Sequence, residues 1–479
     1  MYGRRVIYTD VDEINPSNII AVLQEALLIH NQNRHEIKTL YEYYRGKQAI
    51  ENRVKDVRPE INNKIVENRA NEIVTFKTGY LVGEPIVYIN RTDDDTLTEG
   101  VNSVNEYMYI ESKNNKDKKL VDWMHIAGTA NRLVLPRIKH GEDEAPFAFY
   151  TLAPLNSFVI YSSGLDKKRM AGVKIVYDRN MTPIYSVWTD NWYYEVKEGA
   201  ITNSSELDGK PVLGQPTLYG AVPMVEYPLN EARLGAFEIV LSMLDAINEV
   251  ASDRIDGIDQ FIQSLMIFCN CDIDEETFAA LKELGALKYH SDSNNPASVE
   301  ILTQELNQMQ TQTLVDYMYE TILTICGMPN RNGGSSTSDT GSAVIMRDGW
   351  SAAEARAKDT ENMFDESEKE FLKLVLSYLR NSDCANVPPL YAIKPQFTRR
   401  NYENIVNKAN VLVTMLGCNK IHPKLAFIHC GMFPDGEAAW AMSKEYYEQE
   451  AKAKQDALIK ELTMHNADNN AGNGNVSEN

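Results

Sequence analysis

Two long amphipathic helices that bracket a short insert are the feature that most restricts how this chain can fold. The first predicted helix, 235–262, repeats apolar residues at helical spacing over about 40 Å of rod. The second, 304–326, carries a similar stripe and ends at Gly327-Met328-Pro329. Between them, 266–302 has the pattern of two strands and a short helix, which predicts a small α/β insert.

A third long helix, 343–380, follows a segment rich in Asn, Gly, Ser and Thr at 330–342. That composition predicts a mobile loop. One chain cannot easily bury three rods that each carry a single apolar stripe, whereas subunits repeated around an axis can bury them side by side. The pattern therefore suggests a ring in which a loop at each subunit's inner edge forms a constriction.

The rest of the chain predicts an α+β fold that is mainly helical. Strand-like runs rich in aromatic and β-branched residues fill 145–230 and predict an antiparallel sheet, whose Tyr and Trp residues we interpret as core or cross-strand pairs. From 401 the chain is again helical, and the tail 465–479 is predicted to be disordered. The N-terminal part predicts four helices, at 16–46, 60–78, 96–110 and 117–132.

The charge balance narrows the function. The 48 Lys and Arg residues face 68 Asp and Glu residues, a net charge of −20. This argues against a free-standing nucleic-acid binder, which needs a basic patch to neutralise phosphates. It does not argue against a protein that lets DNA pass, because an acidic bore repels phosphate within a Debye length of about 8–10 Å.

Much of this acidity lies on the first long helix, where six acids accompany one base, Arg254. We interpret the acids as a solvated acidic face of the rod, directed into a lumen or outward to solvent. They are Glu238, Asp245, Glu249, Asp253, Asp256 and Asp259.

Nothing in the sequence predicts an enzyme or a cofactor site. The usual phosphate-binding, dinucleotide-binding, nucleophile-elbow and zinc-protease motifs are absent. Asp93-Asp94-Asp95 could be read as a metal cluster, but a solvated turn that caps the next helix is the better interpretation. Cys269 and Cys271 are interpreted as buried thiols of a strand rather than zinc ligands, and six cysteines in 479 residues are too sparse for a disulfide framework. No signal peptide and no membrane-spanning segment is predicted.

Several segments, in the same order along the chain, resemble the portal proteins of tailed double-stranded-DNA bacteriophages of the long-tailed type. Together they span about 41–380, and no single one is specific. They are Tyr43–Ile50 (YYRGKQAI), Asn62–Asn68 (NNKIVEN), Gly79–Pro85 (GYLVGEP), Val222–Tyr227 (VPMVEY), Ser252-Asp253, and Gly341–Ala343 leading to Arg347–Trp350 (RDGW).

The resemblance implies a portal fold in a ring-shaped homo-oligomer, a dodecamer, with names for the predicted parts. It implies a wing of helices and antiparallel sheet, a stem of long helices, a small α/β clip, a tunnel loop and a helical crown. The implied boundaries are wing 1–234, stem helix 235–265, clip 266–303, stem helix 304–327, tunnel loop 328–342, kinked helix and return to the wing 343–400, crown 401–464 and tail 465–479.

The resemblance also implies function and partners. The ring would occupy one capsid vertex of the virion, seed head assembly in the host cytoplasm, dock the packaging motor and conduct DNA in and out. Its partners would be other copies of itself, double-stranded DNA, the terminase large subunit, a head-completion or neck adaptor protein, and the major capsid and scaffolding proteins, with no membrane.

The same resemblance assigns two groups of site residues. The DNA-facing candidates, with Arg331 and Arg347 as the bases, are Asn330, Arg331, Asn332, Ser335, Ser336, Thr337, Ser338 and Arg347. The candidates for binding partners at the clip are Asp272, Asp274, Glu275, Glu276, Tyr289, His290, Asn294 and Asn295. Two alternatives stay open: a helical scaffold or adaptor protein of a phage, and a metal-dependent phage nuclease that uses Asp93–Asp95.

Overall fold

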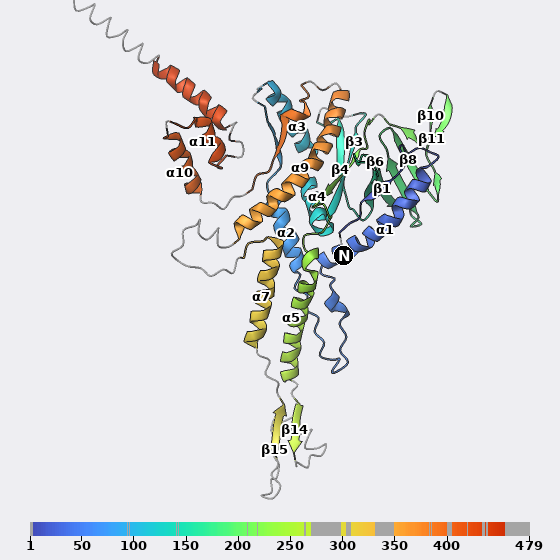
Figure 1. The fold of residues 1–479 in the computed structure, drawn as a ribbon, viewed down its shortest axis with the longest axis vertical. Helices are drawn as coiled ribbons and strands as arrows, with labels where there is room; N and C mark the ends of the chain where they lie inside the picture. The colour runs from blue at the N-terminus through green and yellow to red at the C-terminus, as the bar shows by residue number, and fades with distance from the viewer. Residues whose placement is uncertain are drawn as a thin grey trace, which may run out of the picture.

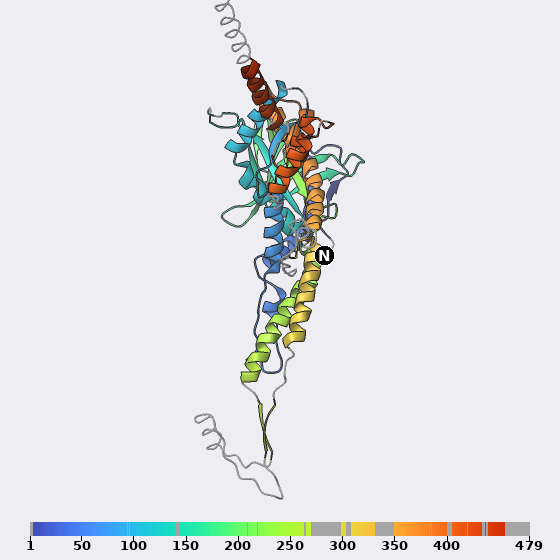
Figure 2. The ribbon, with the colours of Figure 1, turned by 90° about the vertical axis from the view of Figure 1, so that its left-hand side faces the viewer.

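The structure is a computed structural model that describes residues 3–92, 94, 96–139, 141, 143–207, 209–217, 219–262, 265–269, 298–302, 308–330, 349–382, 384, 386–399, 405–418, 420–433, 436 and 439–455. It is a mixed α and β structure, as predicted. A domain built on β-sheets lies at one end, and two long helices extend from it (Figure 1). We call the first part the sheet domain and the two helices, α5 and α7, the stem. Figure 2 shows that the stem continues along the molecule's long axis.

The largest sheet in the sheet domain has seven strands. Ile7–Thr9 at its edge pairs in parallel with Ser157–Ser162, whereas the other neighbours are antiparallel, so the predicted antiparallel sheet is confirmed except at this edge. The predicted cross-strand pairing of aromatic residues is also found, since Trp188 lies opposite Tyr193. The strands are β1 (Ile7–Thr9), β5 (Ser157–Ser162), β6 (Arg169–Tyr177), β7 (Pro183–Trp188), β8 (Trp192–Lys197) and β12 (Gln215–Pro216), with β9 (Ala200–Ile201) beside β8.

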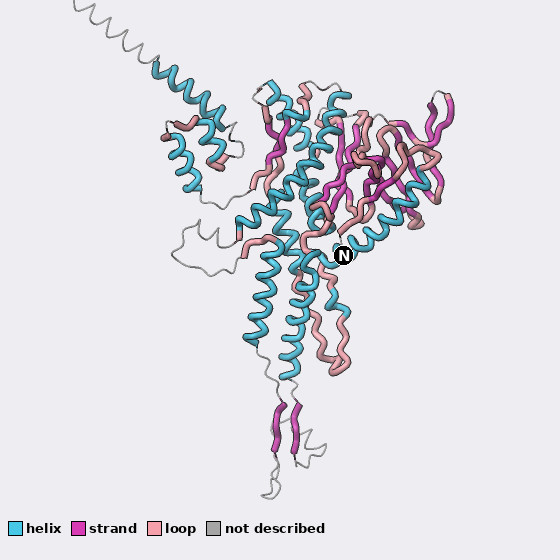
Figure 3. Tube along the Cα trace, viewed as in Figure 1, coloured by secondary structure: helices cyan, strands magenta, loops and turns pink. Residues whose placement is uncertain are grey.

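Helix α1 (Ile19–Tyr44) covers this sheet. Alternate residues of β6, Ala171, Val173 and Ile175, are buried, and they form one core cluster with Ile19 and Val22 of α1. The face of the strand formed by alternate residues therefore packs against the face of α1 formed by residues at helical spacing. Figure 3 shows the strands gathered on the side of the sheet domain where α1 lies.

A three-stranded sheet, in the order β13 (Met224–Pro228), β3 (Thr129–Pro136) and β4 (Phe147–Leu152), organises the main core. Helices from distant parts of the sequence surround it and share one buried cluster with it. They are α3 (Thr96–Ile110), α4 (Lys113–Ala127) and α9 (Trp350–Asn381). Two smaller pairs complete the sheet domain: β2 (Val87–Asn90) with β16 (Ile393–Gln396), and β10 (Ser204–Leu207) with β11 (Lys210–Leu213).

Two helix boundaries differ from the prediction. The helix predicted at 60–78 is α2 (Arg69–Val82), because Asn68 caps it and the residues before Asn68 are not helical. The helix predicted at 117–132 is α4, which ends at Ala127. Gly128 ends it with a φ of 80° and an N–H bond to Met124 O of 2.8 Å, and strand β3 begins at the next residue.

The stem confirms the pair of long helices. Chain order runs from a short 3₁₀ turn, Glu238–Val240, through α5 (Leu241–Ile262) and strand β14 (Leu265–Cys269). It returns through strand β15 (Ser298–Leu302) and α7 (Gln308–Cys326). The two strands pair antiparallel at the far end of the stem (Figure 1). Cys269 and Ser298, the last described residue before the central part of the insert and the first after it, therefore lie opposite each other. Cys269 lies on β14 as predicted but is exposed, which corrects its assignment as a buried thiol; Cys271 lies outside the described residues.

Helical structure dominates the described C-terminal residues. Helix α10 (Ile405–Leu416) packs on α11 (Pro423–His429) through a small cluster that includes Leu412, Phe427 and Trp440, and residues 439–455 are helical. The predicted tail 465–479 lies outside the described residues. Within the described part of the chain, no helix has the length and apolar character needed to cross a bilayer.

Candidate functional site: the stem and its anchors

The stem joins the sheet domain through an apolar junction. Buried residues of α5 and α7, among them Leu244, Ile247, Ile322 and Leu323, form one cluster with residues of α1 and α2 such as Ile73. Below this junction the apolar stripe of α5 becomes exposed, at Ile255 (39%) and Ile258 (48%). The apolar stripe of a single chain is therefore covered only near the sheet domain.

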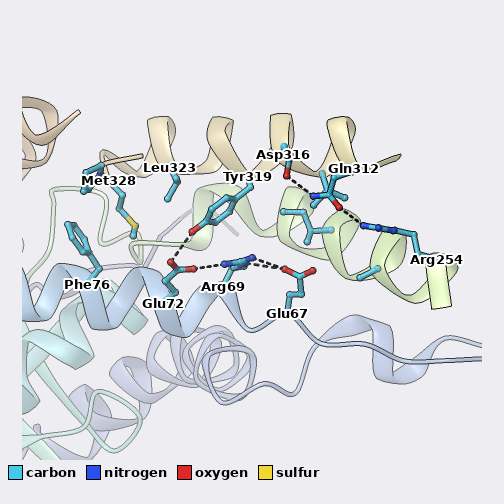
Figure 4. Close-up of a pocket in the computed structure, with 14 residues that line it drawn as sticks. Glu67, Arg69, Glu72, Phe76, Arg254, Gln312, Asp316, Tyr319, Leu323 and Met328 are labelled. Atoms are coloured by element: carbon cyan, nitrogen blue, oxygen red, sulfur yellow. Dashed lines mark hydrogen bonds and ion pairs between the residues drawn. The ribbon is translucent and has the colours of Figure 1, made fainter. Parts of the chain in front are cut away.

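A cleft of about 310 Å³ opens where α2, α5 and α7 meet (Figure 4). Its floor is charged: the Arg69 guanidinium bonds to Glu67 and to Glu72, and it lies 4.3 Å from the ring centroid of Tyr319 on α7. The Tyr319 hydroxyl donates to Glu72 over 2.8 Å. These contacts tie the first turn of α2 to the middle of α7 and so hold the stem at a defined angle to the sheet domain.

The six acids predicted to form a solvated face lie on one side of the stem, but most of them bind other parts of the chain. Glu238 is buried and bonds to Arg4 over 2.6 Å, and Asp245 accepts from the Tyr43 hydroxyl over 2.9 Å. Asp256 is 3% exposed. The prediction of a solvent-facing acidic rod is therefore wrong for Glu238 and Asp256; on the same helix, Glu249 and Asp253 are exposed.

Residues 46–68, which we call the strap, cover the acidic side of α5. The strap leaves α1, descends beside α5 and returns to α2 (Figure 1). Arg53 forms ion pairs with Asp253 and Asp256, and Lys55 forms one with Asp256. Three of the six charges that we expected to face solvent or a lumen, those of Glu238, Asp253 and Asp256, are thus paired with bases of the same chain.

Backbone bonds of the strap form a ladder on α5. The N–H groups of Asn63, Ile65 and Glu67 donate to side chains at positions 256, 252 and 248, over 2.7, 2.9 and 2.8 Å. Two extended residues advance about 6.6 Å, and four helical residues advance about 6 Å. Because these two distances are nearly equal, every second residue of the strap lies beside the next turn of α5. Asn248, Ser252 and Asp256 are all buried, so the three hydrogen bonds are shielded from solvent.

The second anchor is a group of four buried charges that binds α9 to the three-stranded sheet. Glu368 of α9 is fully buried and accepts from Lys113 over 2.9 Å and from Arg132 over 3.2 Å. Both bases also pair with Asp117. The hydroxyls of Tyr88 and Tyr227 donate to Glu368 over 2.5 and 2.7 Å. Two bases and two acids make the group neutral, as a buried set of charges requires.

Electrostatics favour the charged form of Glu368 in this group. Burial by itself would raise the pKa of Glu368, but the nearby Lys113 and Arg132 charges and the Tyr88 hydrogen bond outweigh it and lower the pKa to about 2. The Arg132 guanidinium also lies 4.7–5.2 Å from the ring centroids of Phe149, Tyr227 and Phe371. Arg132 is therefore enclosed by carboxylates at its edge and by aromatic rings on its faces.

The first turns of α9 are held differently, on the surface of α2. Trp350 packs near Phe76 and Tyr80, the Tyr80 hydroxyl donates to Glu354 over 2.9 Å, and Arg399 pairs with Glu354 and Glu361. These contacts are partly exposed. The helix that leads away from the predicted tunnel loop is thus anchored at its start to α2 and later to the buried charge group.

The predicted DNA-facing residues fall almost entirely outside the described residues. Asn330, the first of them, is described: it is partly buried and its amide donates to Glu320 over 3.3 Å. The chain is described again at Gly349, where an added Cβ would lie 3.7 Å from Met328 O. The described residues on either side of 331–348, Asn330 and Gly349, therefore both lie beside the junction of stem and sheet domain. Outside the described residues lie Arg331, Asn332, Ser335, Ser336, Thr337, Ser338 and Arg347.

The predicted clip residues are likewise outside the described part: Asp272, Asp274, Glu275, Glu276, Tyr289, His290, Asn294 and Asn295. Of the three aspartates weighed as a metal cluster, only Asp94 is described. Its carboxylate accepts from the N–H of Thr96 over 3.0 Å and from its hydroxyl, as the capping interpretation predicts. Among the described residues no group of three or more His, Cys, Asp or Glu is placed to hold a metal ion.

Sequence reasoning missed the strap and the buried charge group. A signal for the strap was present, since Asn62, Asn63 and Asn68 are poor residues for a helix interior and Pro59 precedes them. A second signal is the spacing of Asn248, Ser252 and Asp256, polar residues four apart on a helix. For the charge group there is no comparable signal, because Glu368 on α9 lies more than 230 residues from the other three members, which are on α4 and β3.

Comparison with known proteins supports one family. The chain matches the family described as "Phage portal protein, SPP1 Gp6-like" over residues 24–463, nearly its whole length. No curated protein gives a match. The matched family consists of structural proteins of the phage capsid and not of enzymes. The match includes the strap, both stem helices and α9, which are the parts that the contacts above tie together, and it extends through α10 and α11. The chain therefore belongs to the phage portal protein family.

Proposed function

We propose that copies of this chain form a dodecameric ring at one vertex of the capsid and that DNA is packaged and ejected through it. The observation that carries the proposal is the stem, where α5 and α7 expose apolar residues that the described part of their own chain does not cover. Exposed fractions there reach 50% for Leu314 and 66% for Tyr317. Neighbouring stems placed side by side around an axis would bury these side chains.

Family membership supports the more specific roles. We propose that the wing is 1–234, the stem 235–265 and 304–327, the clip 266–303 and the crown 401–464. The clip would bind the terminase motor during packaging and a neck adaptor afterwards, and the ring would seed assembly of the capsid and scaffolding proteins. The β14–β15 pair supports this placement of the clip, because it lies at the end of the stem farthest from the sheet domain (Figure 1).

For DNA contact we propose the segment 330–342 together with Arg347. Asn330 and Gly349, the described residues on either side of 331–348, both lie beside the junction of stem and sheet domain, which supports this proposal. Its Asn, Ser and Thr groups suit weak contacts with phosphate, and Arg331 adds one charge. The acids of α5 contribute less to a repulsive bore than their number suggests, because the strap and Arg4 neutralise several of them.

The mass of the purified particle tests the ring. Native mass spectrometry should give a species about twelve times 54.2 kDa, and electron micrographs should show rings with a central channel. A species of one subunit would contradict the proposal and favour the adaptor alternative. Metal-dependent nuclease activity lost on changing Asp93–Asp95 would favour the nuclease instead.

A separate experiment tests the loop. Deleting 333–338 should leave rings of normal mass but reduce the amount of DNA that particles package or retain. Packaging at the full level by these rings would contradict a role of the loop in DNA movement.

A further inference from the structure

We propose that the strap is half of the contact between neighbouring subunits: the tip of the strap of one copy packs on the exposed face of α7 of the next copy. This inference rests on the ring proposed above and adds which surfaces meet and in which direction. The partner is a second copy of this chain, joined head to tail.

The tip of the strap presents apolar side chains to solvent. Val54 is 82% exposed and Val57 80% exposed. Arg53 and Lys55, on either side of Val54, are bound to acids of α5. The backbone that carries the two valines is therefore already fixed to the stem. Covering the valines with a partner would then cost little further conformational entropy.

The matching surface lies on α7. Leu314 and Tyr317 are exposed, whereas Ile322, Leu323 and Cys326 are buried against the rest of the stem junction. At 100° per residue, Tyr317 lies on the side of α7 opposite to Ile322. In Figure 1, α5 lies between α7 and the strap, so the two exposed apolar surfaces are on opposite sides of one stem.

Charge explains why the strap is needed at such a contact. The helix α7 has two acids, Asp316 and Glu320, and no Lys or Arg, and α5 has five acids and one Arg. Two bare stems placed side by side would repel each other. The strap, 46–68, has five Lys or Arg and four Asp or Glu, a net charge of +1. Laid over the acids of α5, it offers α7 of the next copy a surface with less negative charge and an apolar tip.

The direction of the contact follows from these surfaces. Pairing α7 with α7 would bring two acid-only helices together, which costs free energy. Pairing strap with α7 brings unlike surfaces together, and repeating such a heterologous contact closes a ring. The strap tip of each copy therefore packs on α7 of one neighbouring copy, and α7 of each copy receives the strap tip of the other neighbour.

The test uses two full-length variants, Val54→Asp/Val57→Asp in the strap and Leu314→Asp/Tyr317→Asp in α7. Each should remain near 54 kDa under conditions where the unchanged chain forms rings. All changed side chains are exposed, and unchanged circular dichroism and thermal unfolding will show that each variant folds. An equimolar mixture should form dimers, because the intact strap of one variant meets the intact α7 of the other. A matched control, Ile138→Asp, changes a side chain that is 96% exposed on the sheet domain and should leave rings intact.

The outcomes separate this inference from the proposed function. If the unchanged chain is monomeric, both fail. If the unchanged chain forms rings but either folded variant still does so, only the inference fails. The inference would also be overturned if Ile138→Asp lost its rings to the same extent as the two variants. It would likewise be overturned if the mixture of the two variants stayed monomeric. A variant that does not fold is replaced by Val57→Ser or Tyr317→Ser at the same position, for which the same results are required.

Discussion

Arg132 of β3 and Glu368 of α9 lie 3.2 Å apart with both side chains fully buried, although 236 residues separate them in the sequence. This pair joins the three-stranded sheet to the helix that leads from the predicted tunnel loop. Its position means that α9 cannot shift along the sheet without exposing or unpairing a charge, so the sheet domain holds this part of α9 in one register.

Replacing Arg132 with Met should destabilise the sheet domain by about 3–5 kcal/mol, because Asp117 and Glu368 would share a single base, Lys113, in a buried site. Denaturation by urea measures the change. Lys369→Met on the same helix removes an ion pair whose Lys is 53% exposed and should cost less than about 1 kcal/mol. Equal effects of the two substitutions would contradict the assigned role of the buried group.

Lowering the pH from 7 to 5 should destabilise the chain through His30. Burial against Phe158 lowers the pKa of His30 to about 4, so the folded state keeps the ring neutral while the unfolded chain binds a proton below about pH 6.5. Stability is therefore complete above pH 6.5 and is lost as the pH falls toward 4. Between pH 7 and 5 the loss from His30 is about 2 kcal/mol.

The substitution His30→Gln tests this pH dependence. Gln can still donate to Leu155 O, which His30 Nε2 contacts at 3.3 Å, but it does not titrate. The variant should show a flatter stability profile between pH 7 and 5. His35→Gln, at an exposed position of the same helix, should leave the profile unchanged. A profile as steep in His30→Gln as in the unchanged chain would assign the pH dependence to other groups.

Asp256→Ala should release the strap. It removes the acceptor of the Asn63 N–H and the partner of Lys55, leaving buried donors unpaired at a cost of about 1–3 kcal/mol. Limited proteolysis by trypsin should then cut after Arg53 and Lys55 faster than in the unchanged chain. The control is Glu249→Ala, an exposed acid on the same helix, which should not alter cleavage. Cleavage at the same rate in both variants would show that the ladder does not hold the strap.

Gly128→Ala should destabilise the fold more than Gly199→Ala. Both glycines have positive φ, 80° and 76°, so Ala is strained by about 1 kcal/mol at either position. At Gly128 the new Cβ would also lie 2.0 Å from Arg233 O, whereas nothing lies within 4 Å at Gly199. The difference in melting temperature between the two variants isolates the effect of this close contact. Similar melting temperatures would mean that the Gly128 backbone relaxes without penalty.

Sequence patterns were sufficient for the elements with strong periodicity. The apolar stripes of α5 and α7, the aromatic and β-branched runs of β5–β8 and the capping pattern before α3 each depend on residues close in the chain, so local sequence determines them. Where a helix was predicted wrongly, at 60–68 and 128–132, the deciding contacts are distant: Asn248, Ser252 and Asp256 bind the strap in an extended form, and Arg233 O crowds Gly128.

The acids of α5 show most clearly what the amino-acid sequence determines alone and what the tertiary structure decides. Local sequence determines that Asp245, Glu249, Asp253, Asp256 and Asp259 share α5 and that Glu238 lies in the 3₁₀ turn just before it. Which of them face water depends on segments about 200 residues away: Arg4 pairs with the buried Glu238, and the strap buries Asp256 and supplies Arg53 and Lys55, whereas Glu249 and Asp253 stay exposed. Helical periodicity is a property of neighbouring residues, whereas the pairing of a buried charge is a property of the assembled fold.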